Sequence, residues 1–289
     1  MFTPKLIVTD LDKTALKDDK SVSPATIQAF AQCQAMGIPV VIATARYIAG
    51  ARPYVRLLHP DYLILTDGTL VYQQQRERLR LVYSNAMDVK TTNQLLTELK
   101  QAGYASHIAI PTVYGLFRYP DGCPADFTAN GDTVAVSEPV LPELDFHSKA
   151  FQTTSDGNTI GYHFDIHKPF PHPGNKLVAW LPDDQTASRI ADVCGCKQFH
   201  YHGENLYTFY SMTASKMDAI RHVTQQLNIS VEDVLVFGDD INDMEMIANC
   251  GMGVAMKNAL PEVKAAANDI TLSNEEDGVA WYLNHYVLH

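Results

Sequence analysis

The sequence contains few cysteines and no long apolar segment. Its five cysteines are odd in number and scattered over 289 residues, which argues against a disulfide framework. No stretch approaches the roughly 20 apolar residues that a membrane span requires. The first ten residues, MFTPKLIVTD, lack the basic segment and apolar stretch of a signal peptide. We therefore expect a cytoplasmic protein that does not enter the membrane.

Basic residues are also scarce. The chain has 22 Lys and Arg against 33 Asp and Glu, and its net charge is -11. No basic run offsets this excess, and a surface of this charge repels nucleic acid and anionic membranes. We expect neither as a partner. An anionic substrate would have to be held by a few local cations.

The length exceeds that of a usual single domain, and the composition is that of a globular protein, with 46% hydrophobic and 19% charged residues. Apolar runs rich in β-branched residues, such as IPVVIATAR and YLILTDGTL, alternate with helical patterns. One such helix is bounded by Ser23 at its N-cap and Gly37 at its end. The pattern predicts an α/β fold with a doubly wound, Rossmann-like parallel sheet.

The parallel pattern is interrupted after Tyr83. A predicted helix over residues 88–102 leads into alternating strands broken by Pro, Gly and Asp, and the parallel pattern resumes with SKMDAIRHVTQQL and VLVFGDDINDMEMIANC. We therefore predict a catalytic core made of residues 1–83 and 204–289. Residues 84–203 would form an inserted α+β cap domain.

Polar residues gather where the predicted core strands end. Asp10 and Asp12 follow the run LIVT, Thr44 ends the next strand, and Asp239 and Asp243 follow VLVFG. Open parallel sheets bind ligands beyond these strand ends. Several carboxylates close together require a strong positive charge among them, and a donor set of oxygen without His or Cys favours Mg²⁺.

A magnesium site of this kind predicts a phosphate ester as the small-molecule ligand. Lys216, near a helix N-terminus, and the Thr44 hydroxyl would hold the phosphoryl oxygens. Asp10 could attack phosphorus and form an aspartyl phosphate. Asp12, two residues on, could protonate the leaving oxygen and later deprotonate water.

These residues resemble the motifs of a known family. The segment from Asp10 to Thr14 is similar to the D-x-D-x-T motif of the haloacid dehalogenase superfamily, and FGDDINDMEM resembles its G-D-x-x-N-D motif. With Thr44, Lys216 and the tail GVAMKNALPEVKAAAND in the same order, the chain resembles the Cof-like phosphatase branch. That branch carries its cap between the second and third motifs.

The resemblance implies a role for each matching residue. It makes Asp10 the nucleophile and a metal ligand, and Asp12 the general acid and base whose carbonyl also binds the metal. It makes Asp239 a metal ligand, with Asp243 in or next to the metal shell. The phosphate-binding residues that it implies are Thr44, Lys216 and Asn242, the last orienting the phosphoryl group or Lys216.

Three residues depart from the family pattern. Lys13, Ala45 and Met217 stand where Gly is common in the family, so each removes a small or flexible residue near the expected phosphate. Slowed or redirected turnover is the consequence that we expect from them.

The sequence thus predicts a magnesium-dependent phosphomonoester hydrolase for a small phosphorylated metabolite, with sugar phosphates favoured. Flavin-precursor or pyridoxal phosphates are alternative substrates, and a phosphomutase would share the phosphoaspartate. A non-catalytic phosphosugar-binding module is a further alternative, but it would be expected to lack Asp10, Asp12 or Lys216. We expect specificity residues in segments 119–129 and 167–176.

Three further residues are expected to have no catalytic role, and two roles are left open for a fourth. Asp240 is expected to be a solvated neighbour, and Asp67 and Gly68 are expected to shape a turn. Arg46 is expected either to form a salt bridge between core and cap or to contact the substrate.

Overall fold

The computed structural model describes residues 2–76, 78–105, 108–119, 143–145, 162–201 and 205–288. The chain forms two compact units, and each is described by itself. Unit 1 comprises Met1–Arg46, Ala51–Tyr83 and Ser215–His289. Unit 2 comprises Tyr47–Gly50 and Ser84–Ala214.

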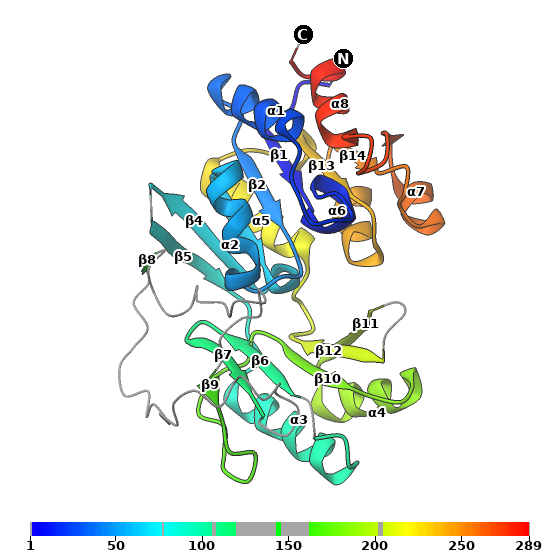
Figure 1. The fold of residues 1–289 in the computed structure, drawn as a ribbon. Coiled ribbons are helices and arrows are strands. Elements are labelled where there is room, and N and C mark those ends of the chain that lie inside the picture. Colours follow the sequence, from blue (N-terminus) through cyan, green and yellow to red (C-terminus); the bar gives the residue numbers. More distant parts are fainter. Residues whose placement is uncertain are drawn as a thin grey trace. The chain divides into compact units, whose positions relative to one another are not determined.

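Unit 1 is built on a mixed sheet with the strand order β15-β14-β13-β1-β2-β3-β4-β5 (Figure 1). β1 pairs in parallel with both β2 and β13, whereas β3 and β4 are antiparallel. The strands are β1 (Leu6–Thr9), β2 (Val40–Ala43), β3 (Tyr62–Leu65), β4 (Leu70–Gln75), β5 (Arg78–Ser84), β13 (Val234–Gly238), β14 (Met252–Ala255) and β15 (Asp269–Ile270). The predicted parallel core is confirmed.

The four central strands β1, β2, β3 and β13 are buried along their whole length. Helices cover both faces of the sheet, which explains why these strands are apolar without alternation (Figure 1). The helices of this unit are α1 (Pro24–Ala35), most of α2 (Ile48–Leu58), α5 (Lys216–Leu227), α6 (Met244–Asn249), α7 (Pro261–Ala266) and α8 (Gly278–Tyr286).

The residues that the sequence predicted to begin and end α1 do so in the structure. The Ser23 side chain accepts a hydrogen bond from the Thr26 amide, and Pro24 occupies the first turn. Gly37 follows the helix with a φ of +82°, a conformation that glycine adopts without strain. Helix α2 was not predicted, because Pro53 lies in its interior and is a residue typical of helix ends.

Unit 2 contains a second sheet with the order β11-β12-β10-β6-β7-β9, and helices α3 (Val89–Gln101) and α4 (Asp184–Cys194) pack against it in the described part of this unit (Figure 1). Its strands are β6 (Ala109–Thr112), β7 (Gly115–Arg118), β9 (Tyr162–His163), β10 (Leu177–Trp180), β11 (Lys197–His200) and β12 (Leu206–Tyr210). A three-residue strand, β8 (Glu143–Asp145), is not part of this sheet.

The return of the chain to unit 1 lies later than the expected boundary at residue 204. β12 pairs with β10 and β11, so its residues belong to the sheet of unit 2. Unit 1 resumes at Ser215, the N-cap of α5. The division of labour between a catalytic core and a specificity cap stays a prediction.

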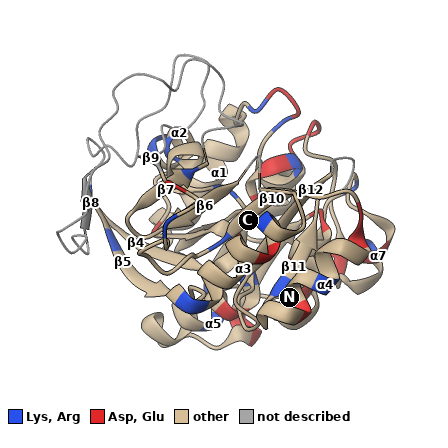
Figure 2. Ribbon diagram, turned by 90° about the horizontal axis from the view of Figure 1, so that it is seen from below, with Lys and Arg blue, Asp and Glu red and all other residues tan. Residues whose placement is uncertain are grey.

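Acidic and basic residues are intermixed along the described ribbon (Figure 2). Among the residues that the structure describes, no helix combines the length and apolar character of a membrane span. The cysteines in this part of the chain are buried free thiols, and burial raises the pKa of each one: Cys33, Cys194, Cys196 and Cys250. Cys123 lies outside the described residues.

Candidate active site

Two carboxylates meet at the carboxyl ends of neighbouring strands. Asp10 directly follows β1 and Asp239 directly follows β13, and these strands are parallel with Thr9 opposite Phe237. The Asp10 amide donates to the Phe237 carbonyl at 3.0 Å, which continues the strand pairing into the site. Both side chains are buried. The sheet register therefore brings together residues that are 229 positions apart in the sequence.

A buried lysine joins this pair to a third carboxylate. The Lys216 ammonium donates to Asp10 Oδ1 at 2.7 Å and to Asp243 Oδ1 at 2.6 Å, and the side chain is 1% exposed. Lys216 is the first residue of α5, where the Ser215 side chain caps the helix. Burial alone would lower the pKa of Lys216, but the two carboxylates outweigh it and raise that pKa.

The loop after β13 fixes Asp243. Its second oxygen, Oδ2, accepts from the amides of Asp239 at 3.0 Å and Asp240 at 3.2 Å. A side chain at Gly238 would come within 2.5 Å of Asp243 Cβ, so the strand end must be glycine for Asp243 to fold back. The Asp240 carboxylate accepts from the Ile241 amide and caps the following turn.

The three carboxylates can offer one oxygen each to a single ion. Suitable atoms of Asp10, Asp239 and Asp243 all lie within 4.8 Å of one another, and no other such group of His, Cys, Asp or Glu occurs in the described part of the chain. Burial, with repulsion from Asp243, raises the pKa of Asp239 to about 7. Burial also raises the pKa of Asp10, despite the attraction of Lys216.

One lysine therefore does not balance the negative charge of this cluster. Thr14 donates to Asp239 Oδ1 at 2.8 Å, which orients that carboxylate and leaves its other oxygen for a further ligand. An all-oxygen, buried and anionic donor set fits a hard divalent cation such as Mg²⁺.

The Asp12 carboxylate lies outside this cluster and is paired with two cations. Arg46 Nε donates to Oδ2 at 2.6 Å and Arg46 Nη2 to Oδ1 at 2.7 Å, while Lys20 Nζ donates to Oδ1 at 2.9 Å. Burial would raise the pKa of Asp12, but the hydrogen bonds from Arg46 and Lys20 outweigh it and lower that pKa to about 2. The contact of Arg46 with Asp12 lies within unit 1.

The structure places two of the three departures from the family pattern. Lys13 has a φ of +58°, a conformation that costs about 1–2 kcal/mol for a residue with a side chain and that glycine adopts freely. Its carbonyl accepts from Asn258 at 2.8 Å, which supports the turn. Met217 is 1% exposed and contacts the Cys250 thiol, so it fills the core beside α5.

Asn242 is hydrogen bonded to Asp67. Its amide donates to Asp67 Oδ1 at 3.0 Å, a contact that sequence reasoning missed. Asp67 is buried and has a φ of +58°, in a turn that follows β3. A side chain at Gly68 would overlap the carbonyl oxygen of Ser215, so this turn packs directly against the start of α5. The glycine in the sequence TDG is the local signal for this turn, because Gly68 has a φ of +94° and glycine adopts that conformation without strain.

Thr44 follows β2, the neighbour of β1 in the sheet. It is buried, its amide donates to the Ile64 carbonyl at 2.8 Å, and its hydroxyl accepts from the Arg46 amide at 3.2 Å. The hydroxyl thus helps to hold the backbone of Arg46, the residue whose guanidinium contacts Asp12.

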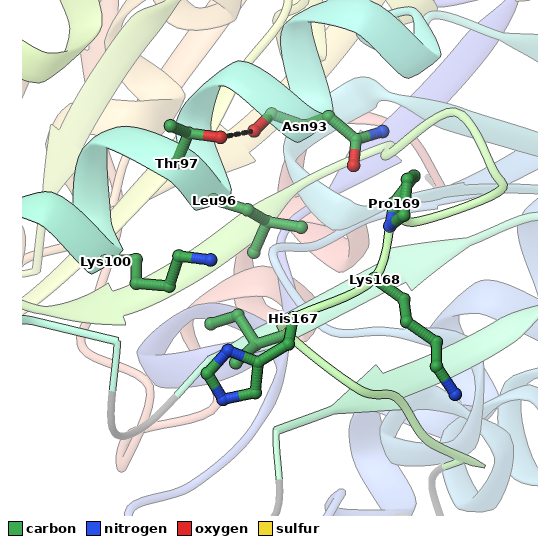
Figure 3. A pocket seen from close by; sticks show the side chains of 8 residues that line it. Asn93, Leu96, Thr97, Lys100, His167, Lys168 and Pro169 are labelled. Atoms are coloured by element: carbon green, nitrogen blue, oxygen red, sulfur yellow. Dashed lines mark hydrogen bonds between the residues drawn. The ribbon is translucent and has the colours of Figure 1, made fainter.

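Unit 2 contains a pocket of about 280 Å³, and three of its lining residues, 167–169, belong to the predicted specificity segment 167–176. It is lined from α3 by Asn93, Leu96, Thr97 and Lys100, and from the facing loop by Ile166, His167, Lys168 and Pro169 (Figure 3). The Asn93 side chain bonds both the amide and the carbonyl of Phe170, which ties this loop to α3. Beyond residue 119, the other predicted segment, 119–129, lies outside the described residues.

Comparison with known proteins identifies the family. The family model for haloacid dehalogenase-like hydrolases matches residues 7–283, so the chain belongs to this family. Within it the chain is an enzyme of the phosphatase group, as its relatives show. It is 27% identical to phosphatase YwpJ of Bacillus subtilis (strain 168), over 97% of this chain and 99% of that protein.

A second relative in the same organism is the 5-amino-6-(5-phospho-D-ribitylamino)uracil phosphatase YitU, 26% identical over 98% of this chain and 97% of that protein. Among solved structures, a subclass IIB sugar phosphatase superposes with a TM-score of 0.75, covering 97% of this chain and 98% of that one. Its sequence identity is 16%, so this likeness shows the shared fold.

Proposed function

We propose that the enzyme is a magnesium-dependent phosphomonoester hydrolase that works through an aspartyl phosphate on Asp10. The observation that carries this proposal is the buried Lys216 ammonium bonded to both Asp10 and Asp243, with Asp239 beside them. Buried charges of this density are costly for a fold and are typical of functional sites.

The metal ligands in this proposal are the carboxylates of Asp10, Asp239 and Asp243. The backbone carbonyl of Asp12 would be a further ligand. When bound, Mg²⁺ supplies positive charge to the oxygens of a phosphoryl group. The all-oxygen donor set and the raised pKa of Asp239 support this assignment.

The chain's own residues would then divide the reaction between them. Lys216 and the Thr44 hydroxyl hold phosphoryl oxygens, which reduces the repulsion between the phosphate and the Asp10 carboxylate. Asp10 attacks phosphorus and displaces the leaving oxygen, which takes its proton from Asp12. Because Arg46 and Lys20 keep Asp12 ionised in the free enzyme, Asp12 has to take up a proton before this step. Asn242, held by Asp67, orients the phosphoryl group. In the second step Asp12 accepts a proton from the attacking water.

The substrate in this proposal is a small phosphorylated metabolite, and a sugar phosphate is favoured. A relative is named for a phosphorylated ribitylamino compound, and a protein of the same fold is named a sugar phosphatase. Unit 2 would select the leaving group, as the cap does in the family that the motifs resemble.

Metal removal tests the proposal. Exhaustive chelation should stop hydrolysis of an aryl phosphate, and added Mg²⁺ should restore it. With sugar phosphates the product should be free phosphate, and sugar phosphates should give a higher kcat/KM than nucleotide or cofactor phosphates. Turnover that survives chelation, or a product that is mostly isomerised sugar phosphate, would refute the hydrolase as proposed.

A further inference from the structure

The Asp12 carboxylate is held by three hydrogen bonds from two cations. The Arg46 guanidinium binds both of its oxygens, at 2.6 Å and 2.7 Å, and Lys20 adds a third contact at 2.9 Å. A two-point contact of this kind fixes the plane of a carboxylate, whereas a single ammonium allows it to rotate.

The two cations are themselves held in place by one aromatic residue. The Tyr54 hydroxyl donates to the backbone carbonyl of Lys20 at 3.1 Å. The Tyr54 ring also lies under the Arg46 guanidinium, with 5.1 Å between Cζ and the ring centre. Lys20 has a φ of +67°, and its amide closes a turn onto the Lys17 carbonyl at 2.9 Å. All four side chains of this arrangement belong to unit 1.

The contact between Asp12 and Lys20 adds little to stability. The Asp12 side chain is 37% exposed and that of Lys20 is 51% exposed. An ion pair as exposed as that of Asp12 with Lys20 contributes about 0–1 kcal/mol to folding, whereas the two-point contact of Arg46, whose side chain is 25% exposed, contributes more. What the arrangement does achieve is a fixed orientation for a carboxylate that stands two residues after Asp10.

We propose that Arg46 and Lys20 are positioning residues that hold the Asp12 carboxylate oriented to accept a proton from the water that hydrolyses the phosphoenzyme. This inference rests on the proposed function. In that step the water oxygen bonds to phosphorus, and the bond between phosphorus and the Asp10 oxygen breaks. The bonding electron pair returns to Asp10, the water proton passes to Asp12, and hydrogen phosphate leaves.

The two half-reactions make different demands on Asp12, and this difference provides the test. With para-nitrophenyl phosphate the leaving group departs without a proton, so formation of the phosphoenzyme does not need Asp12. Hydrolysis of the phosphoenzyme still needs it. Loss of either positioning residue should therefore slow the second step selectively.

The experiment is steady-state and rapid-mixing kinetics on Lys20→Ala and Arg46→Ala with para-nitrophenyl phosphate and Mg²⁺. We expect kcat to fall by about 10-fold or more while kcat/KM, which reports phosphoenzyme formation, stays within about twofold. A burst of nitrophenolate approaching one per enzyme should appear. Lys20→Arg, which keeps the positive charge, should recover most of kcat.

Lys5→Ala is the matched control, because Lys5 forms a single exposed contact of 2.7 Å with Asp233, away from the site residues. It should leave both constants unchanged. An equal fall of kcat and kcat/KM, or no change in either, would overturn the inference. Because Lys20 is half exposed, Lys20→Ala decides the matter even if Arg46→Ala fails to fold. The proposed function would stand in either case as long as Asp10→Asn is inactive.

Discussion

The two units bury different kinds of side chain. Among the described residues, unit 1 buries four carboxylates and a lysine near the strand ends of its sheet, namely Asp10, Asp67, Asp239, Asp243 and Lys216. The core of unit 2 is dominated by apolar and aromatic groups, in which Phe117 and Phe170 pack edge to face with ring centres 5.1 Å apart. Apolar burial stabilises a fold, whereas buried charge contributes little net stability and must be paired. This difference supports placing the proposed catalytic site in unit 1.

The largest expected effect comes from removing the central cation. Lys216→Met would leave Asp10 and Asp243 buried without their ammonium partner. We expect a loss of about 3–5 kcal/mol in the free energy of unfolding and a complete loss of turnover. Mg²⁺ should recover part of the stability and none of the activity, because phosphate binding also requires Lys216. Thermal unfolding with and without Mg²⁺ measures the first effect, and an aryl phosphate assay the second.

The counterpart in unit 2 is Ile190→Ala in α4. Ile190 is fully buried in the apolar core, so its truncation should cost about 2–5 kcal/mol. Below the melting temperature the variant should still hydrolyse an aryl phosphate. If Ile190→Ala and Lys216→Met lost activity in proportion to stability, the contrast between the units would be false.

A smaller effect is expected where a turn meets α5. Gly68→Ala would strain a residue with a φ of +94° and push its new methyl group onto the Ser215 carbonyl, which displaces Lys216. We expect a loss of about 1–3 kcal/mol and at least a tenfold fall in kcat/KM. Gly37→Ala is the matched control, because Gly37 has a φ of +82° with open space around it. It should cost about 1 kcal/mol and leave kcat/KM unchanged.

The smallest effect concerns pH. The pKa of Asp239 is raised in the folded chain to about 7, from about 4 when unfolded. Protonation therefore favours the folded state, and this stability is present below about pH 4 and is lost as the pH rises through about 7. Without divalent metal, the melting temperature should fall by several degrees between pH 5 and pH 8. Mg²⁺ should raise it more at pH 8 than at pH 5, and an equal increase at both would contradict the assignment.

Much of this arrangement could be predicted from the sequence. Apolar runs ending in Asp10, Thr44 and Asp239 indicated parallel strands, and parallel strands place their ends at one edge of a sheet. Lys216 was expected there because it opens a helix after a capping serine. These signals are local in sequence, or follow from a topology with few alternatives.

The pairing of loop side chains could not be predicted in the same way. Arg46 was expected to bridge the domains or to contact substrate, and its contact with Asp12, shared with Lys20, was not predicted. Asn242 was expected to orient phosphate or Lys216, and its contact with Asp67 was not predicted. No periodicity specifies which loop residues meet, because that depends on turn geometry such as the positive φ of Lys20 and Asp67.

The central claim is that Asp10 of unit 1 carries the phosphoryl group, and Asp10→Asn tests it most directly. An amide has nearly the size of the carboxylate but is not a nucleophile, so we expect a folded protein whose aryl phosphate hydrolysis falls by about 10⁴-fold or more. Circular dichroism and the melting curve establish the fold, and phosphate release measures the rate. Turnover close to that of the unmodified enzyme would contradict covalent catalysis at this residue.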